Sequence, residues 1–145
     1  KEAMSGIEKK GKIIMHVAAG DVHEIGKNIV STILEAKGYE VVDLGKSVPP
    51  DKVVAAVKEH KPDVVSGTSL MTSTRGAFPK IVQMMKEAGI ELPFIVAGGS
   101  VDTAFAEEMD FAIYADGPEV GDTVIKEAKA GKKWKDIRED IHSSY

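Results

Sequence analysis

Residues 12–28, KIIMHVAAGDVHEIGKN, decide the fold. The run at 13–17 is almost continuously apolar, which is typical of a strand that is buried on both faces of a parallel sheet. A short segment with glycine and acidic residues follows, and apolar residues then recur at helical spacing as Ile25, Ile29 and Ile33. The stretch therefore predicts a buried strand, a loop and an amphipathic helix.

The same alternation recurs along the chain. Short apolar runs predict strands over 12–18, 40–44, 63–67, 93–97 and 111–114, and periodic segments predict helices over 24–37, 51–60, 75–88, 101–108 and 118–130. Gly38 and Gly89 stand where helices end, and Pro62 and Pro93 precede strands. Five strand–helix units in sequence predict an α/β fold, a doubly wound five-stranded parallel sheet of flavodoxin-like order 2-1-3-4-5.

Length and composition indicate one domain and exclude several kinds of chemistry. The chain has 145 residues, a net charge of −4 and no cysteine, so disulfides, thiolate nucleophiles and cysteine-ligated metal sites are excluded. Its only short basic cluster lies near residue 133, which argues against nucleic acid as a partner. The sequence shows no membrane span and no signal peptide, so we expect a cytoplasmic protein with no membrane partner.

We expect the domain to span 12–131. Residues 1–11 read as a leader, and 132–145 as a C-terminal extension that places Trp134 and Ile137 on one face. In a doubly wound sheet, ligands bind outside the carboxyl ends of the strands, so the loops that follow the strands are the candidate site. All five loops carry glycine, hydroxyl residues or both, which leaves room for a polar, elongated group.

Asp21 and His23 in the first of these loops form the main candidate pair. A carboxylate bound to one ring nitrogen fixes the imidazole tautomer and leaves the other nitrogen free to bind a metal or to move a proton. A flavin phosphate would be repelled here by Asp21 and Glu24. A phosphoacceptor receiver domain would need an aspartate at the end of the third strand, where this chain has Gly67 and Thr68.

Each signal taken alone also has a purely structural interpretation. Asp21 and Glu24 could form a capping box, and His23 could be a solvated loop residue. The pair at 98–99 could be only a turn, and the hydroxyl run at 68–74 could cap the helix expected at 75. We expect His16 to be structural and two histidines, His60 and His142, to lie on the surface.

In combination these motifs resemble the cobalamin-binding (B12-binding) domain family. Asp-x-His-x-x-Gly stands at 21–26, Thr-x-Leu begins 45 positions after His23, and Gly-Gly stands at 98–99. The family pattern has Ser where this chain has Thr68. The resemblance covers about residues 11–131. The segment 67–80 looks most like corrinoid proteins of methanol- and methylamine-type methyltransferase systems, with the methanol type favoured.

The resemblance implies a base-off/His-on cobalamin, with His23 as the lower axial ligand of cobalt. It implies that Asp21 binds the other imidazole nitrogen and that Thr68 completes the relay through a hydrogen bond to Asp21. The cofactor-binding set is then Asp21, Val22, His23, Glu24, Ile25, Gly26, Thr68, Leu70, Thr72, Gly98, Gly99, Asp116, Gly117 and Pro118. The slot for the nucleotide tail would be lined by Gly26, Leu70, Thr72, Gly98 and Gly99. Its far end would be edged by Asp116, Gly117 and Pro118.

The function that the resemblance implies is that of a corrinoid protein. It would carry a methyl group on cobalt between a substrate-specific, methyl-donor methyltransferase and an acceptor methyltransferase, as a carrier component rather than a complete enzyme. Two alternatives stay open: the B12 domain of an adenosylcobalamin-dependent mutase, and a non-catalytic cobalamin sensor module. Such carriers also have an N-terminal helical bundle, so residues 1–11 could be the remnant of a helical segment that has been removed.

Overall fold

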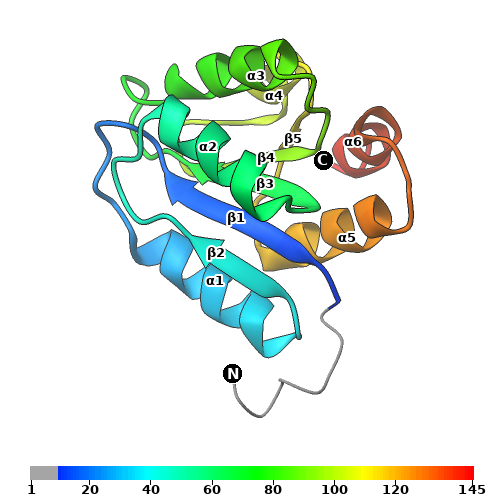
Figure 1. Ribbon diagram of the computed structural model, residues 1–145. Coiled ribbons are helices and arrows are strands. Elements are labelled where there is room, and N and C mark those ends of the chain that lie inside the picture. The colour runs from blue at the N-terminus through cyan, green and yellow to red at the C-terminus, as the bar shows by residue number, and fades with distance from the viewer. Residues whose placement is uncertain (1–9) are drawn as a thin grey trace.

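The protein forms a parallel five-stranded sheet between two layers of helices. The computed structural model describes residues 10–145, so most of the expected leader lies outside the described residues (Figure 1). The strands are β1 (Lys12–Val17), β2 (Glu40–Asp43), β3 (Val64–Thr68), β4 (Phe94–Ala97) and β5 (Ala112–Tyr114), in the order β2-β1-β3-β4-β5. All neighbouring pairs are parallel, as the sequence predicts.

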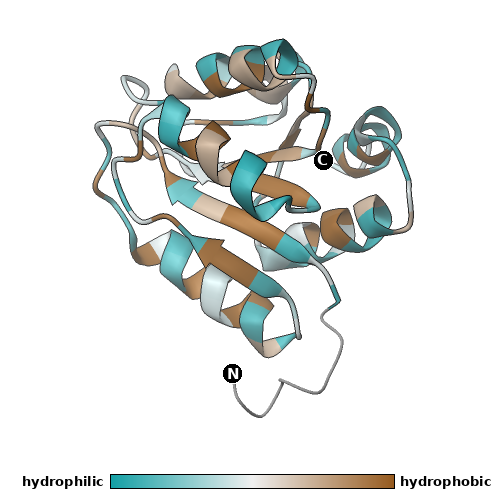
Figure 2. Cartoon of the chain, in the orientation of Figure 1, coloured by the Kyte–Doolittle hydropathy of each residue, from teal (hydrophilic) through white to brown (hydrophobic). Residues whose placement is uncertain are grey.

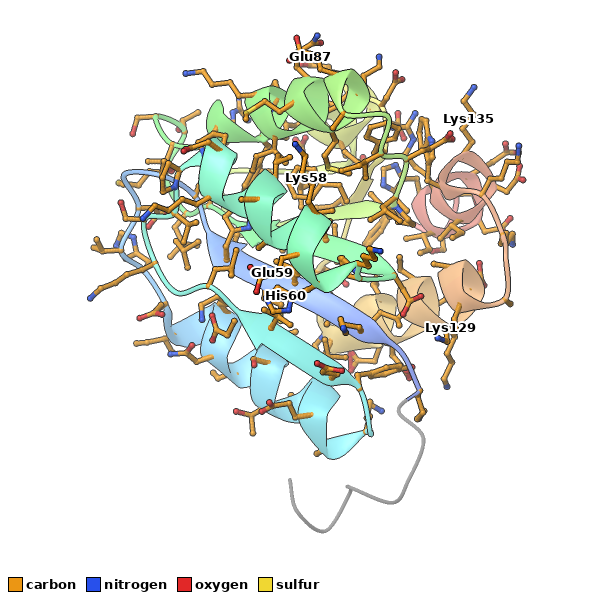
Figure 3. The ribbon with its side chains drawn as sticks, in the orientation of Figure 1. Lys58, Glu59, His60, Glu87, Lys129 and Lys135 are labelled. Carbon is orange, nitrogen blue, oxygen red and sulfur yellow. The ribbon has the colours of Figure 1, made fainter. Side chains whose placement is uncertain are left out.

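Six helices follow or flank the strands. They are α1 (Ile25–Ala36), α2 (Pro50–His60), α3 (Ala77–Glu87), α4 (Thr103–Glu107), α5 (Pro118–Lys129) and α6 (Trp134–His142). The first five match the predicted helices to within one to two residues at each end, and α6 shows that the C-terminal extension is helical. The charged side chains of Glu87, Lys129 and Lys135, on α3, α5 and α6, point away from the body of the protein (Figure 3).

The helices divide between the two faces of the sheet. Alternate strand residues point to opposite faces, so Ile14 packs with α2, α3 and α4, whereas Ile13 packs with the buried side of α1 and α5. The strands are hydrophobic along most of their length because both faces are covered (Figure 2). Residues 18–24, 68–76 and 98–102 connect strands to helices at the carboxyl edge of the sheet, where the candidate residues gather.

Candidate binding site

A cavity of about 360 Å³ opens between the sheet and the helices α1 and α5. Its floor is formed by residues of β1, β3 and β4, its walls by α1, α5 and the end of β5, and its mouth by the loops at the carboxyl edge. The lining residues are mostly apolar or small: Ile13, Met15, His23, Gly26, Lys27, Val30, Leu34, Ser66, Thr68, Leu70, Ile95, Ala97, Gly98, Gly99, Tyr114, Ala115, Asp116, Gly117 and Gly121.

His23 stands at the mouth of this cavity with one ring nitrogen engaged. Its Nδ1 lies 2.7 Å from Asp21 Oδ1, and its backbone N–H donates to the same oxygen at 3.0 Å. Asp21 is fully buried, whereas the His23 side chain is 52% exposed. Because Nδ1 faces a carboxylate oxygen, the neutral ring carries its proton on Nδ1, and Nε2 is free to donate a lone pair.

Asp21 is held by donors on the far side of its carboxylate as well. Oδ2 accepts the Leu70 N–H at 2.8 Å and the Thr74 hydroxyl at 3.3 Å. Burial alone would raise the pKa of Asp21, but the hydrogen bonds from His23 and Leu70 outweigh it and lower the pKa to about 2. Asp21 is therefore a carboxylate at neutral pH, and it orients the imidazole through a charge-assisted hydrogen bond.

The expected hydrogen bond from Thr68 to Asp21 is not present. Thr74 occupies that role, since its hydroxyl reaches Asp21 Oδ2 and also lies 2.8 Å from the Ser69 hydroxyl. Thr68 ends β3, and the chain then turns so that position 74, six residues later, faces the carboxylate. The Thr68 hydroxyl is buried and has no hydrogen-bond partner among residues 10–145, and it lines the cavity. The hydroxyl run therefore contributes a residue that sequence reasoning did not single out.

Glycines open this region in two ways. Gly98 has φ of +109°, and a Cβ there would lie 2.3 Å from Ser69 O, so only glycine lets the two loops approach so closely. At Gly99 and Gly121 a Cβ would meet nothing closer than 3.8 Å, so their missing side chains leave open space in the cavity. Gly26 has nothing within 4 Å of a built Cβ.

Lys27 is the second residue of the site that sequence reasoning missed. Although it is a lysine, its side chain is fully buried beside the cavity. Its Nζ lies 2.6 Å from Asp43 Oδ2 and 3.4 Å from a carboxylate oxygen of Glu24. The contact with Asp43 joins the start of α1 to the end of β2. Asp43 also accepts the Gly45 N–H at 2.9 Å. The ion pair thus anchors the helix that follows the His23 loop.

The other predicted residues lie around the mouth or outside the cavity. Three apolar side chains close to His23 in sequence or at the mouth are exposed: Val22, Ile25 and Leu70. Asp116 and Gly117 line the cavity, but Pro118, at the start of α5, and the exposed Thr72 do not. The cavity lining thus contains most of the predicted set, and Asp21, Val22, Glu24 and Ile25 also lie outside it.

The structural alternatives for the acidic loop and the hydroxyl run do not hold. The N-cap of α1 is Glu24, and no side chain caps that helix, so Asp21 and Glu24 form no capping box. Likewise, α3 begins at Ala77 with no side-chain cap. His16 is buried, as expected. The expectation that His142 lies on the surface is wrong, because its side chain is only 5% exposed.

Known proteins match this chain over most of its length. The model of the B12 binding domain family matches residues 11–127. The methanol–corrinoid protein of Methanosarcina barkeri is 47% identical over 120 residues, which cover 80% of this chain and 46% of the relative. The trimethylamine corrinoid protein of Methanosarcina barkeri is 38% identical over 118 residues, which cover 80% of this chain and 54% of the relative.

A solved structure agrees with the same grouping. A chain of the methanol:cobalamin methyltransferase complex MtaBC from Methanosarcina barkeri superimposes with a TM-score of 0.87 at 41% identity. The match covers 97% of this chain and 56% of that chain. The chain thus spans about half the length of the relatives it matches. Among residues 10–145, no helix has both the length and the apolar character that a membrane span requires.

Proposed function

The chain belongs to the B12-binding domain family, and we propose that it is the corrinoid-carrying domain of a methyltransferase system. The observation that carries the proposal is the pairing of His23 with Asp21 at the mouth of the cavity. Nδ1 is fixed at 2.7 Å from a buried carboxylate, and Nε2 is left free on a half-exposed ring. A metal ion that is already held in the ring of a cofactor would need only this one nitrogen from the protein.

The cavity fits the rest of a base-off cobalamin. Such a cofactor presents a flat ring and a nucleotide tail that ends in an aromatic base. The exposed apolar side chains Val22, Ile25 and Leu70 offer a surface for the ring, and the cavity between α1 and α5 offers an apolar slot for the tail. The Thr68 hydroxyl lines the slot without a hydrogen-bond partner among residues 10–145, and a heteroaromatic nitrogen would satisfy it.

Each residue then has a defined task. His23 supplies the lower axial nitrogen, Asp21 holds the tautomer and raises the basicity of the ring, and Thr74 holds Asp21. Cobalamin, when bound, supplies the nucleophilic cobalt that accepts and donates a methyl group. The protein's contribution is ligation, orientation and partial exclusion of water from one face of the ring.

The partners follow from the relatives. Relatives are named as methanol and trimethylamine corrinoid proteins, and a similar chain occurs in a complex with a methanol:cobalamin methyltransferase. We therefore propose a substrate-specific methyltransferase as the donor partner and a second methyltransferase as the acceptor, in the cytoplasm. The segment that resembles methanol-type proteins, and the 47% identity to one of them, favour the carrier over a mutase domain or a sensor.

The test is the identity of the axial nitrogen. The protein is prepared with ¹⁵N-labelled histidine, loaded with cobalamin and reduced to Co(II). If His23 is the ligand, the nitrogen splitting in the EPR spectrum changes from a triplet to a doublet upon labelling. An unchanged triplet would show that the dimethylbenzimidazole still binds cobalt and would refute the proposal.

A matched pair of variants separates His23 from the other histidines. His23→Gln should lose the histidine splitting, whereas His60→Gln, a change at the outer end of α2, should keep it. Persistence of the histidine splitting in His23→Gln would place the ligand elsewhere in the chain.

A further inference from the structure

The outer edge of β5 is covered by side chains of the C-terminal segment rather than by another strand. Among residues 10–145, β5 is the last strand of the sheet, and β4 on its inner side is the one strand that pairs with it. On its outer side, Arg138 Nη1 donates to Ala112 O at 3.2 Å, and His142 Nε2 accepts the Tyr114 N–H at 2.9 Å. Four residues separate Arg138 from His142 on α6, so both point to the same side of the helix.

His142 makes this contact in one tautomer. Its Nε2 accepts a hydrogen bond from a backbone amide, so that nitrogen carries no proton of its own. Its Nδ1 lies 2.7 Å from Glu107 Oε2 and therefore carries the ring proton. The side chain is 5% exposed, so water does not replace either partner freely. The neutral ring satisfies both neighbours at once.

The strand end that His142 holds is also a wall of the cavity. Tyr114, Ala115 and Asp116 all line the cavity between α1 and α5. The same C-terminal segment continues to Tyr145, whose hydroxyl accepts the Asp116 N–H at 3.3 Å. The backbone N–H groups at 114 and 116 both point outward from the sheet, and they donate to the side chains of His142 and Tyr145, respectively.

We propose that His142 is a positioning residue for this wall and that it acts only as the neutral imidazole. Addition of a proton to Nε2 turns the acceptor into a donor that faces the Tyr114 N–H, so that contact is lost. The Glu107 contact survives, because a carboxylate accepts equally from the charged ring. Acid should therefore release the outer edge of β5 while α6 stays tethered through α4.

Charged groups of both signs surround His142 and do not change this result. Glu107 faces it from α4, and the side chains that share the adjacent surface hollow are Asp110, Trp134, Lys135, Arg138 and Glu139. From β5 and the C-terminal segment it meets the Tyr114 amide and the Tyr145 ring.

The first measurement needs no cofactor. Hydrogen exchange of the Tyr114 and Asp116 amides is followed by NMR at about pH 8 and about pH 5, with correction for intrinsic rates. Protection of Tyr114 should fall about tenfold at the lower pH, the size expected for loss of one buried hydrogen bond. His142→Gln, whose amide oxygen can accept from Tyr114 and whose NH₂ can donate to Glu107, should keep the protection at both pH values.

Two further variants complete the design. His142→Phe fills the same space without an acceptor and should lack the protection at both pH values. His60→Gln is the matched control, since His60 lies at the end of α2 away from β5, and it should behave as the unaltered chain. Equal protection of Tyr114 at both pH values in the unaltered chain, or an equal acid loss in His142→Gln, would overturn the proposal.

The link to the cavity rests on the proposed function and is tested separately. Cobalamin affinity should fall less between about pH 8 and pH 5 in His142→Gln than in the unaltered chain. His23 and its surroundings are the same in both proteins, so the difference between them isolates His142. An identical fall would overturn the role in positioning the wall. If exchange behaves as expected but cobalamin does not bind at either pH, the cofactor assignment fails and the contact of His142 with β5 stands.

Discussion

The two faces of the sheet differ in where aromatic side chains gather and where small residues leave a cavity. The face under α2, α3 and α4, here the filled face, packs large aromatic side chains: Phe78, Phe94, Phe105, Phe111 and Trp134. The face under α1 and α5, here the cavity face, presents small residues where those helices meet the sheet: Gly26, Ser66, Gly117 and Gly121. The same strands serve both, since neighbouring strand residues point to opposite faces.

This difference separates the stabilisation of the fold from the binding of a ligand. On the filled face, the rings of Phe78 and Phe94 meet edge to face with their centroids 5.4 Å apart. On the cavity face, a side chain such as Leu34 packs on the sheet on one side and borders open space on the other. A ligand that fills the cavity would add the missing contacts and stabilise the folded chain.

The largest expected effect is on stability, and it differs between the faces. Ile81→Ala on the filled face should lower the free energy of unfolding by about 4 kcal/mol, because it leaves a new void in close packing. Leu34→Ala on the cavity face should cost about 2 kcal/mol, because one side of Leu34 already borders open space. Urea unfolding of the ligand-free variants measures both. Equal losses would show that the two faces are packed alike.

The next effect is on binding alone. Gly121→Leu places a side chain inside the cavity, where a Cβ meets nothing closer than 3.8 Å, and it replaces a glycine inside a helix. Cobalamin affinity should fall about 100-fold or more, whereas cobinamide, which lacks the tail, should bind as before. The matched control is Gly76→Leu, since Gly76 has open space around it and does not line the cavity. Equal losses for both ligands would place the tail outside this cavity.

The smallest of the three effects concerns pH and the filled face. Burial lowers the pKa of His16 from 6.5 to about 4, partly offset by its hydrogen bond to Ser66 O. Between these values the unfolded chain binds more protons than the folded one. Stability should therefore be full above about pH 6.5 and decline toward pH 4, with about 2 kcal/mol lost at pH 5.

His16→Asn tests this assignment. The asparagine amide can still donate to Ser66 O, and it does not titrate. Urea unfolding at a series of pH values should show a flatter acid decline in this variant than in the unaltered chain. His60→Asn, on the outer end of α2, should retain the full decline. An unchanged slope in His16→Asn would assign the acid sensitivity to other groups.

Much of the fold was predictable because its signals are local. Continuous apolar runs, glycines at helix ends and prolines before strands lie within a few residues of the elements they define, and the helices and strands follow from them. The pair Asp21 and His23 was predictable for the same reason, since both stand in one loop and their contact spans two residues. Where the expectation differed, as at the start of α3, the preceding turn at 69–76 makes long-range contacts with Asp21 and Ser100 that local preference does not show.

The rest of the site depends on contacts between distant parts of the chain. Thr74 meets Asp21 across 53 residues, and Lys27 meets Asp43 across 16. Nothing in the sequence around Lys27 indicates that its side chain is buried, because its neighbours on α1 include exposed residues. The same holds for His142. Because it stands in a charged C-terminal segment, the sequence indicates a surface residue, but its side chain binds Tyr114 of β5 across 28 residues.

The sequence by itself determined the five strand–helix units, the sheet order, the family and the imidazole–carboxylate pair. Periodicity and short motifs carry these, because each is written within one element or one loop. Only the tertiary structure decided which hydroxyl holds Asp21, which one faces the cavity and which side chains close the edge of β5. Those choices depend on where the chain turns after each strand and on which helices pack together, and hydrogen bonds between such segments form only once the sheet has brought them within about 3 Å.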